Sequence, residues 1–333
     1  MLEMAITMSD IAKHTGSSIS SVSAALKGNR STAKVSEKKR REILKAAKQL
    51  GYRPSHAART LKIGRTNVIG MVIGEIHTPH YGEMTSLLME EAEKYGYSIQ
   101  IYVTNWESER AVKALELLLG GRCDGILMYE GCMSEENRRQ FKYLEKNKIP
   151  MVMLANPIKG FAHVGEEWNS GYIEIAEYIR LKGISSAVFL GDSVDNLERP
   201  KLKSMVDVFE KYGLELDMIE CHDNPDYVYD FGRDFRSLIN PPQMILTEND
   251  TLANALLKGL SEAGVKVPHE VGIIGYNNTN FSKFSNPALT TVGFDKIKFI
   301  RQAIKMLVKM IENNTITREE YYLPTYLVKR DSA

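Results

Sequence analysis

From residue 68 onward, short apolar runs alternate with longer stretches in which apolar residues recur at helical spacing. The runs lie at 68–73, 99–103, 125–129, 151–154, 187–190, 244–247 and 272–276. Each run is continuously apolar rather than alternating, which is typical of strands covered on both faces in a parallel sheet with crossover helices. Seven or more such units are too many for one simple sheet. We therefore predict an α/β body of two doubly wound subdomains.

The first 52 residues show helical periodicity only. Three short apolar-periodic stretches follow the N-cap residues Thr7, Ser18 and Ser36, and they predict helices over 8–14, 19–27 and 37–50. Gly16 supplies the turn between the first two helices. Such a pair matches the helix-turn-helix motif, whose second helix presents its first residues to base edges in the major groove.

Charge is divided unevenly along the chain. Residues 1–65 hold 14 Lys and Arg against 4 Asp and Glu, whereas the remaining residues hold 29 against 38. A compact basic head is the mark of a polyanion binder, because Lys and Arg displace counterions from phosphates. The basic residues on the third helix, at 38–41, 45 and 48, are either a solvated face or phosphate contacts. The asymmetry indicates a DNA-binding protein.

The segment 53–65 favours a helix but offers only two turns, which is marginal in water. We predict a hinge helix that forms only when other contacts order it. Leu61 lies between basic residues and would suit a wedge that opens a minor-groove step. The pattern equally allows a linker leucine that packs on the body.

Three strings, MSDIAKHTGSSISSVSAALKGN, VSEKKRREILKAAKQLGYRP and ARTLKIGRTNVIG, resemble the LacI/GalR family of bacterial transcription regulators. The resemblance implies a recognition segment over 18–24, with Ile19, Ser20 and Ala24 at the base-reading positions and Leu61 inserted at the operator centre. The implied DNA contacts are Thr7, Ser18, Ile19, Ser20, Ser21, Ser23, Ala24, Asn29, Ser55, Ala57, Ala58, Leu61 and Lys62.

Ala24 departs from the family pattern, because many members carry Arg there in a V-S-R string. Alanine offers a base only apolar contact, such as contact with a thymine methyl group. We therefore expect an operator half-site that differs from that of typical members. Part of the protein's preference for its operator should come from recognition of the sequence-dependent shape of the DNA.

The resemblance extends through the body and implies a core like that of a sugar-type periplasmic binding protein, in which the chain crosses between subdomains three times. We expect the crossings near 160–162, 292–294 and 321–323. The predicted domains are the helix-turn-helix domain 1–52, the hinge helix 53–65, the core N-terminal subdomain 66–160 with 294–321, and the core C-terminal subdomain 161–293 with 322–333.

Ligands of open α/β sheets bind outside the carboxyl ends of the strands. Aromatic residues fall at several predicted strand ends, namely Tyr81, Trp106, Trp168 and Tyr276. With amides and carboxylates they would suit a polar ring compound such as a sugar. Any single ring is better explained by a structural role, and only the shared position of the four rings at strand ends favours a ligand site. The effector contacts implied by the resemblance are Pro79, Tyr81, Asn105, Tyr129, Trp168, Arg199, Asn249, Asn277 and Phe294.

The sequence departs from the family's effector-site pattern at three places. Asn277 stands where many members carry Asp, Ala155 and Asn156 replace an Asp-Arg pair, and Glu167 and Trp168 replace an Asp-Asn pair. Asn both donates and accepts hydrogen bonds, whereas an ionised Asp only accepts them. We expect an effector read in a different way: another sugar, a sugar phosphate contacted by Arg199, or a partner protein.

Several classes of protein are disfavoured. No apolar run approaches the roughly 18 residues of a membrane span, and the N-terminus lacks a secretory signal, so we expect a cytoplasmic protein. Cys123, Cys132 and Cys221 lack metal-ligand spacing, and His77 and His80 lack a third ligand, so no metal site is expected. No nucleophile elbow, Walker loop or dinucleotide fingerprint is present, so we expect neither an enzyme nor a cofactor.

Together these features predict a repressor that binds a pseudo-palindromic double-stranded operator as a homodimer. A small-molecule effector, a sugar or sugar phosphate, would control its operator affinity from the cleft between the core subdomains. Residues 331–333 end the chain without a heptad repeat, so we expect dimers rather than tetramers. The alternatives are a solute-binding module, which predicts no basic head, and a sugar-acting enzyme, which needs convergent carboxylates such as Glu130, Asp192 and Asp250.

Overall fold

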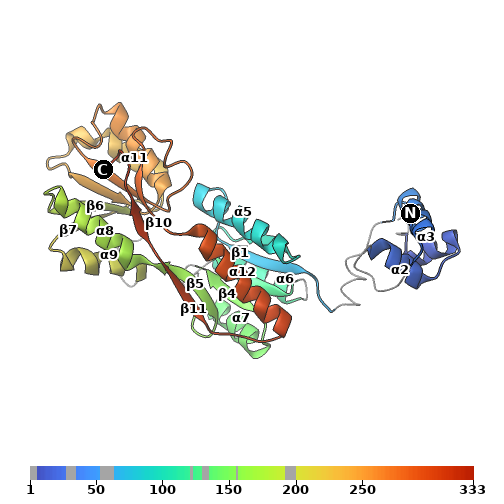
Figure 1. Ribbon diagram of the computed structural model, residues 1–333. Helices are drawn as coiled ribbons and strands as arrows, with labels where there is room; N and C mark the ends of the chain where they lie inside the picture. Colours follow the sequence, from blue (N-terminus) through green and yellow to red (C-terminus); the bar gives the residue numbers. More distant parts are fainter. Residues whose placement is uncertain are drawn as a thin grey trace. The chain divides into compact units, whose positions relative to one another are not determined.

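The computed structural model describes residues 6–27, 35–52, 64–120, 123–129, 135–154, 157–191 and 200–333. The chain divides into two compact units, Met1–Thr66 and Asn67–Ala333, and we describe each by itself (Figure 1). Both predicted classes of structure are confirmed: the first unit is helical and the second is α/β.

The first unit contains α1 (Met8–Thr15), α2 (Ile19–Lys27) and α3 (Glu37–Gln49). A capping box begins α1, in which the Thr7 side chain accepts from the Asp10 backbone N–H and the Asp10 carboxylate accepts from the Thr7 backbone. Gly16 ends the helix in the left-handed region, at φ 57°, which glycine reaches without strain. Ile11, Val22 and Ile43, one from each helix, are fully buried and form the centre of this small core.

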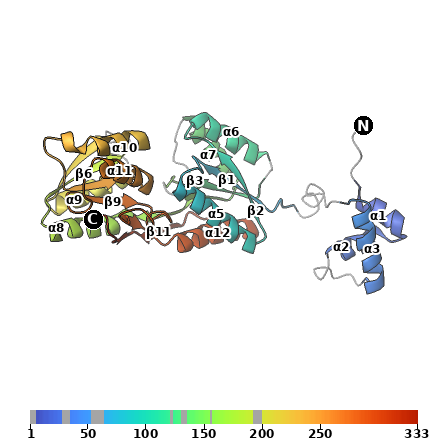
Figure 2. The same cartoon turned by 90° about the horizontal axis from the view of Figure 1, so that it is seen from above.

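The second unit contains two six-stranded sheets. The first sheet has the order β11-β5-β4-β3-β1-β2, and all its pairs are parallel. Its strands are β1 (Val68–Ile73), β2 (Ser98–Val103), β3 (Gly125–Tyr129), β4 (Met151–Leu154), β5 (Ala162–Glu167) and β11 (Glu320–Pro324). Its helices are α5 (Pro79–Lys94), α6 (Ser108–Leu119), α7 (Glu135–Lys146) and α12 (Lys296–Asn313). Figure 2 shows α5 and α12 on one face of this sheet and α6 and α7 on the other. We call these elements the first half.

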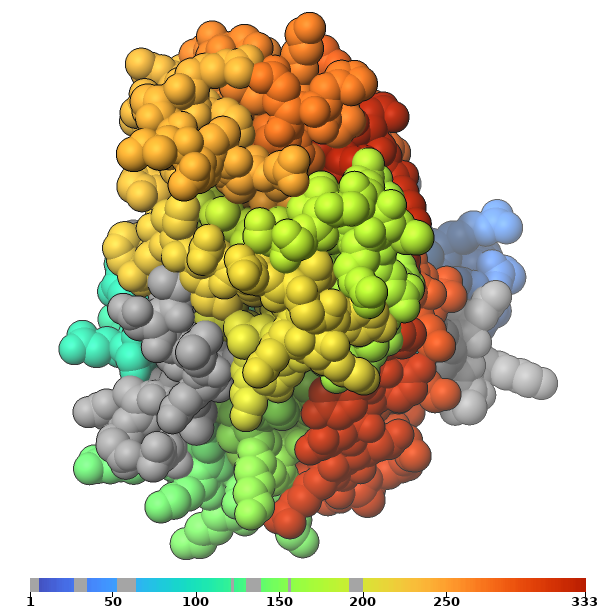
Figure 3. Space-filling view, turned by 90° about the vertical axis from the view of Figure 1, so that its left-hand side faces the viewer, coloured from blue at the N-terminus to red at the C-terminus, as the bar shows by residue number. Residues whose placement is uncertain are grey.

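The second sheet has the order β12-β10-β9-β8-β6-β7, and only its β10–β12 pair is antiparallel. Its strands are β6 (Ser186–Gly191), β7 (Glu215–Glu220), β8 (Met244–Thr247), β9 (Gly272–Tyr276), β10 (Thr290–Gly293) and β12 (Tyr326–Val328). α8 (Trp168–Leu181) and α9 (Pro200–Lys211) cover one face, and α10 (Pro225–Arg233) and α11 (Asp250–Glu262) cover the other. A short 3-10 turn, η2 (Phe235–Ser237), follows α10. We call these elements the second half; Figure 3 shows it, yellow to orange, above the first.

The chain passes between the halves three times, after β5, after β10 and after β11. The first passage follows Glu167 rather than the expected 160–162, because β5 pairs with both β4 and β11 and so belongs to the first sheet. The last passage follows Pro324 rather than 321–323, because β11 pairs with β5 up to that residue. Figure 1 shows these two strands side by side where the chain leaves the first half.

All seven predicted strands are present. The search for continuous apolar runs did not predict five further strands, namely β5, β7, β10, β11 and β12. β7 and β11 lie at or near sheet edges and alternate between exposed and covered positions, so they lack a continuous apolar run. Among the described residues, every helix is too short or too polar to cross a membrane.

Candidate DNA-binding face and effector site

The start of α2 presents three exposed side chains together. The Ser18 hydroxyl caps the helix by accepting from the Ser21 backbone N–H at 3.1 Å, and it lies 2.8 Å from the Ser20 hydroxyl. Ser18 and Ser20 are exposed, and Ile19 between them keeps 53% of its surface in solvent. An isoleucine so exposed at a helix start is free to contact an apolar group such as a base methyl.

The other predicted DNA contacts fare differently. Ser21 and Ser23 are half-buried, and Thr7 serves as the cap of α1. Ala24 is only 7% exposed, so its methyl group lies mainly inside the head rather than beside Ile19 and Ser20. The remaining six, Asn29, Ser55, Ala57, Ala58, Leu61 and Lys62, lie outside the described residues.

The basic face of α3 divides into two groups. Lys39 donates to the Thr15 carbonyl at 2.5 Å and pairs with Glu42, so it joins α1 to α3. Arg40 pairs with Glu37 at 3.5 Å. The other four basic side chains are exposed and available to phosphates: Lys38, Arg41, Lys45 and Lys48.

In the second unit, aromatic side chains gather at the carboxyl ends of β1, β2 and β3. The Tyr81 ring, near the start of α5, packs edge to face against the rings of Trp106 and Tyr129. The distances between ring centres are 5.6 Å to Trp106 and 5.4 Å to Tyr129. The Tyr129 hydroxyl lies 3.1 Å from His80 Nε2. Burial lowers the pKa of His80 to about 3, so this imidazole is neutral near pH 7. Asn105 is exposed, beside Trp106.

A hydrogen bond between β9 and β5 joins the two halves at the carboxyl ends of these strands. The Tyr276 hydroxyl, at the end of β9, donates to Glu166 Oε2 of β5 at 2.7 Å. Burial raises the pKa of the Glu166 carboxyl, while Lys201 and the Tyr276 hydrogen bond partly oppose the shift. The Lys201 ammonium lies 3.6 Å from the centre of the Tyr276 ring, a cation–π contact. Sequence reasoning named Glu167 and Arg199 but missed the nearby Glu166 and Lys201. The contacts of these two residues with Tyr276 depend on the fold and not on neighbouring residues.

Asn249, a predicted effector contact, and its neighbour Asp250 both have structural roles. Asn249 caps α11 by accepting from the Leu252 N–H at 3.0 Å, and it donates to Asp223 at 2.8 Å. Asp250 is 1% exposed and accepts from the Thr279 backbone, the Thr279 hydroxyl and the Thr291 hydroxyl. Asn277, half-buried with φ 95°, begins the loop that Asp250 holds.

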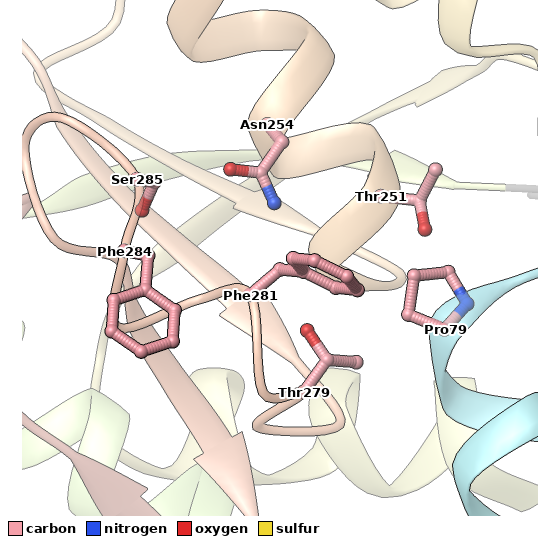
Figure 4. A pocket seen from close by; sticks show the side chains of 7 residues that line it. All are labelled: Pro79, Thr251, Asn254, Thr279, Phe281, Phe284 and Ser285. Carbon is pink, nitrogen blue, oxygen red and sulfur yellow. The ribbon is translucent and has the colours of Figure 1, made fainter.

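Three further predicted effector contacts, Pro79, Phe294 and Trp168, have different surroundings. Pro79 lines a hollow of about 470 Å³ with Thr251, Asn254, Thr279, Phe281, Phe284 and Ser285 (Figure 4). Phe294 is 3% exposed and packs on Phe299 in the core of the first half, so its ring is not offered to a ligand. Trp168 is half-buried and packs on the core of the second half. Arg199 lies outside the described residues.

Both parts of the chain match known families. Residues 7–55 match the bacterial regulatory proteins of the lacI family, and residues 176–333 match the periplasmic binding protein-like domain. The HTH-type transcriptional repressor PurR of Haemophilus influenzae is 27% identical over 321 residues, which cover 95% of this chain and 94% of that protein. The chain therefore combines a DNA-binding domain of the lacI family with a periplasmic binding protein-like domain. It is a transcriptional regulator, as are the relatives that it matches over most of their length.

Solved structures share the fold of this regulator. The lac repressor dimer bound to operator and the anti-inducer ONPF has a TM-score of 0.84 at 18% identity, over 98% of this chain and 99% of that one. The complex of the transcriptional regulator CelR with cellobiose has a TM-score of 0.69 at 19% identity, over 98% and 100%. At such identities the likeness establishes the fold alone.

Proposed function

We propose that this regulator is a sequence-specific repressor that binds a pseudo-palindromic operator as a homodimer. The observation that carries the proposal is the capped start of α2, where Ser18, Ile19 and Ser20 stand exposed together in a basic head. A helix start of this kind fits the major groove and reads base edges. The repressor name of PurR and the operator-bound dimer of lac repressor support it. Chromosomal DNA is its target, so the protein acts in the cytoplasm.

The reading residues in this proposal are Ile19 and Ser20. Ile19 contacts a thymine methyl, and Ser20 donates to or accepts from a base. The proposal gives Ala24 a smaller part than the sequence implied, because little of its surface is exposed. The exposed basic residues of α3 contact phosphates, and the segment 53–65 acts as a hinge whose Leu61 opens a minor-groove step.

We further propose that a small carbohydrate effector binds at the strand ends between the halves. The cellobiose complex of CelR supports this class of ligand. Tyr276 and Glu166 link the halves at this point, so a ligand that contacts either residue bears on how the halves meet. Coupling requires the effector to bind one arrangement of the halves more tightly than the other.

Operator selection tests the proposal directly. The full-length protein is used to enrich binding sites from random duplex DNA, with and without a set of sugars and sugar phosphates. We expect enrichment of one pseudo-palindrome and a change in its recovery with at least one of these compounds. A pool without a shared sequence would contradict the DNA-binding proposal, whereas an unchanged pool would contradict the effector proposal.

The hinge is tested by Leu61→Ala. We expect a loss of at least about 10-fold in affinity for the selected operator and little change for random DNA. Only at the operator do the specific contacts offset the free energy of kinking the base step. Leu181→Ala is the matched control, since Leu181 is 83% exposed on α8. Equal losses on both DNAs in a gel-shift titration would remove the wedge role.

A further inference from the structure

The turn between α1 and α2 determines where the base-reading side chains lie. It consists of residues 15–18, and the exposed side chains of Ile19 and Ser20 follow it directly. A side chain that recognises a base must be held to within about half an ångström of its contact geometry. The bonds that fix this turn therefore bear on sequence specificity, even where they make no contact with DNA.

Local hydrogen bonds fix the turn to α1. The Ser17 N–H donates to the Ala12 carbonyl at 2.9 Å, and the Thr15 hydroxyl donates to the Ile11 carbonyl at 2.8 Å. The hydroxyl groups of Thr15 and Ser17 lie 2.9 Å apart. All of these groups belong to residues 11–17, so they set the shape of the turn but do not join it to α3.

Lys39 provides a bond from α3 to this turn. Its ammonium donates to the Thr15 carbonyl at 2.5 Å and to the two carboxylate oxygens of Glu42 at 3.0 and 3.1 Å. Thr15 is the last residue of α1, where the unpaired carbonyls and the helix dipole favour a cation. An ammonium has three N–H donors, so these three contacts use all of them.

This engagement separates Lys39 from the neighbouring lysine of the same helix. The Lys39 side chain is 35% exposed, and the Glu42 carboxylate at 3.0 Å balances its charge. A phosphate that approached Lys39 would have to displace Glu42 or the Thr15 carbonyl as an acceptor. Lys38, next to it in the chain, is exposed and is the better candidate for a phosphate contact.

We propose that Lys39 is a positioning residue of the recognition helix: with Glu42 it anchors the turn before α2 to α3, and it increases sequence specificity without contacting phosphate. The inference rests on the proposed function, in which Ile19 and Ser20 read bases. It deepens that function by assigning different tasks to two adjacent lysines of α3. Loss of the anchor weakens binding to the operator and leaves the general attraction to DNA intact.

The substitution Lys39→Met tests the role in specificity, because it removes the charge and the donors but keeps the length of the side chain. We expect the affinity of the full-length protein for the selected operator to fall at least about 10-fold, with a change below about 2-fold for random duplex DNA. The slope of log affinity against log salt concentration on random DNA should equal that of wild type.

Lys38→Met is the matched control, since it makes the same change at the adjacent residue. It should weaken binding to operator and random DNA alike. The salt slope should become shallower by about 1.8, because a homodimer then loses two phosphate contacts.

A second pair of variants changes the carboxylates of α3. Glu42→Gln and Glu37→Gln each remove one negative charge, so both should raise the affinity for random DNA. The ratio of operator to random-DNA affinity should fall at least about 3-fold for Glu42→Gln only, because a neutral amide orients the Lys39 ammonium less strongly. Glu37 pairs with Arg40 at 3.5 Å and is 72% exposed, so Glu37→Gln should leave that ratio unchanged.

Hydrogen exchange of the DNA-free protein, resolved to single amides, tests the anchor itself. We expect the amides of residues 15–18 to exchange at least about 3-fold faster in Lys39→Met than in wild type or Lys38→Met, because local opening of the turn becomes easier. The buried residues Val22 and Ile43 should keep slow exchange, which reports that the head is folded. If Lys39→Met unfolds the head, Glu42→Gln decides the test of specificity.

Three results would overturn the inference: a shallower salt slope for Lys39→Met, equal losses on operator and random DNA by a folded Lys39→Met, or wild-type exchange in its turn. An unchanged affinity ratio in Glu42→Gln would also contradict it. Failure of the wild type to select any operator would contradict the proposed function instead. In that case hydrogen exchange still judges whether Lys39 anchors the turn to α3.

Discussion

Asp250 and His80 show how burial changes the task of a single residue. Both are polar side chains near the proposed effector site, and the exposed fraction of each is below a tenth. Asp250 accepts three hydrogen bonds and so fixes the loop that carries Asn277, instead of offering its carboxylate to a ligand. His80 is enclosed by the rings of Tyr81, Tyr129 and Phe294 and remains neutral.

His80 gives a prediction for stability against pH. Its pKa falls from 6.5 to about 3 in the folded protein. Between these values the unfolded chain binds a proton that the native state does not, so the free energy of unfolding falls as pH decreases, by up to about 1.4 kcal/mol per pH unit. The melting temperature of His80→Phe should therefore change less than that of wild type between pH 6.5 and pH 5.

A suitable control for that measurement is His222→Phe, because the His222 side chain is 78% exposed. Its pH profile should follow that of wild type. If His80→Phe and His222→Phe gave the same profile as wild type, His80 would not be a buried neutral imidazole.

At the scale of elements, glycines decide where helices and strands approach closely. Gly259 of α11 and Gly232 of α10 face each other, and a Cβ atom on Gly259 would meet the Tyr229 carbonyl oxygen and lie 2.9 Å from the Arg233 nitrogen. Both are backbone atoms, which cannot turn aside as a flexible side chain can. Helix propensity alone would favour alanine at this position by about 1 kcal/mol.

Gly259→Ala should therefore destabilise the core although it adds a helix-favouring residue. We expect a net loss of roughly 1–3 kcal/mol from overpacking, seen as a lower melting temperature of the full chain. Ser261→Ala, at an exposed position of the same helix, is the control and should have little effect. A higher melting temperature for Gly259→Ala would mean that the two helices separate easily.

A largely buried ion pair joins α5 to α12 and reaches the second half. Lys296 Nζ lies 2.6 Å from Glu83 Oε2, with 10% and 23% of these side chains exposed. Asn280 of the second half donates to the same carboxylate at 3.2 Å, and Lys296 also donates to the Asn278 carbonyl. The cluster thus connects two helices of the first half to the loop that follows β9.

Glu83→Gln and Lys296→Met should each lower the free energy of unfolding by about 2 kcal/mol, because each leaves a partly buried group without its charge partner. The double variant should lose less than the sum, with a coupling energy above ~1 kcal/mol in a double-mutant cycle. The exposed pair Lys258 and Glu262 is the comparison, for which we expect ~0.5 kcal/mol or less. Equal coupling in both cycles would mean that burial adds nothing.

At the scale of the whole molecule, the uneven charge has a direct consequence for DNA binding. In the proposed function the basic first 65 residues contact phosphates, and the negative charge of the remaining residues keeps that part of the chain away from DNA. Operator affinity of the full-length protein should fall about 10³- to 10⁵-fold between 50 and 200 mM salt if two heads make roughly 6–10 phosphate contacts. A flat plot of log affinity against log salt concentration would refute this role for the head.

The sequence by itself determined the elements whose signal is local. Caps at Thr7, Ser18 and Ser36, turns at Gly16 and seven continuously apolar strands follow from neighbouring residues, and the two-part organisation follows from charge and period. The strings that carry the family resemblance are also runs of consecutive residues, so the sequence alone reveals them.

Only the tertiary structure decided which distant residues meet. Glu166 and Tyr276 are 110 residues apart in the chain, and nothing near either of them in sequence signals the bond. The burial of Ala24 and Phe294 and the late crossing after β5 likewise depend on packing across elements. Propensity and periodicity act over a few residues, whereas burial and hydrogen bonding between sheets depend on the complete fold.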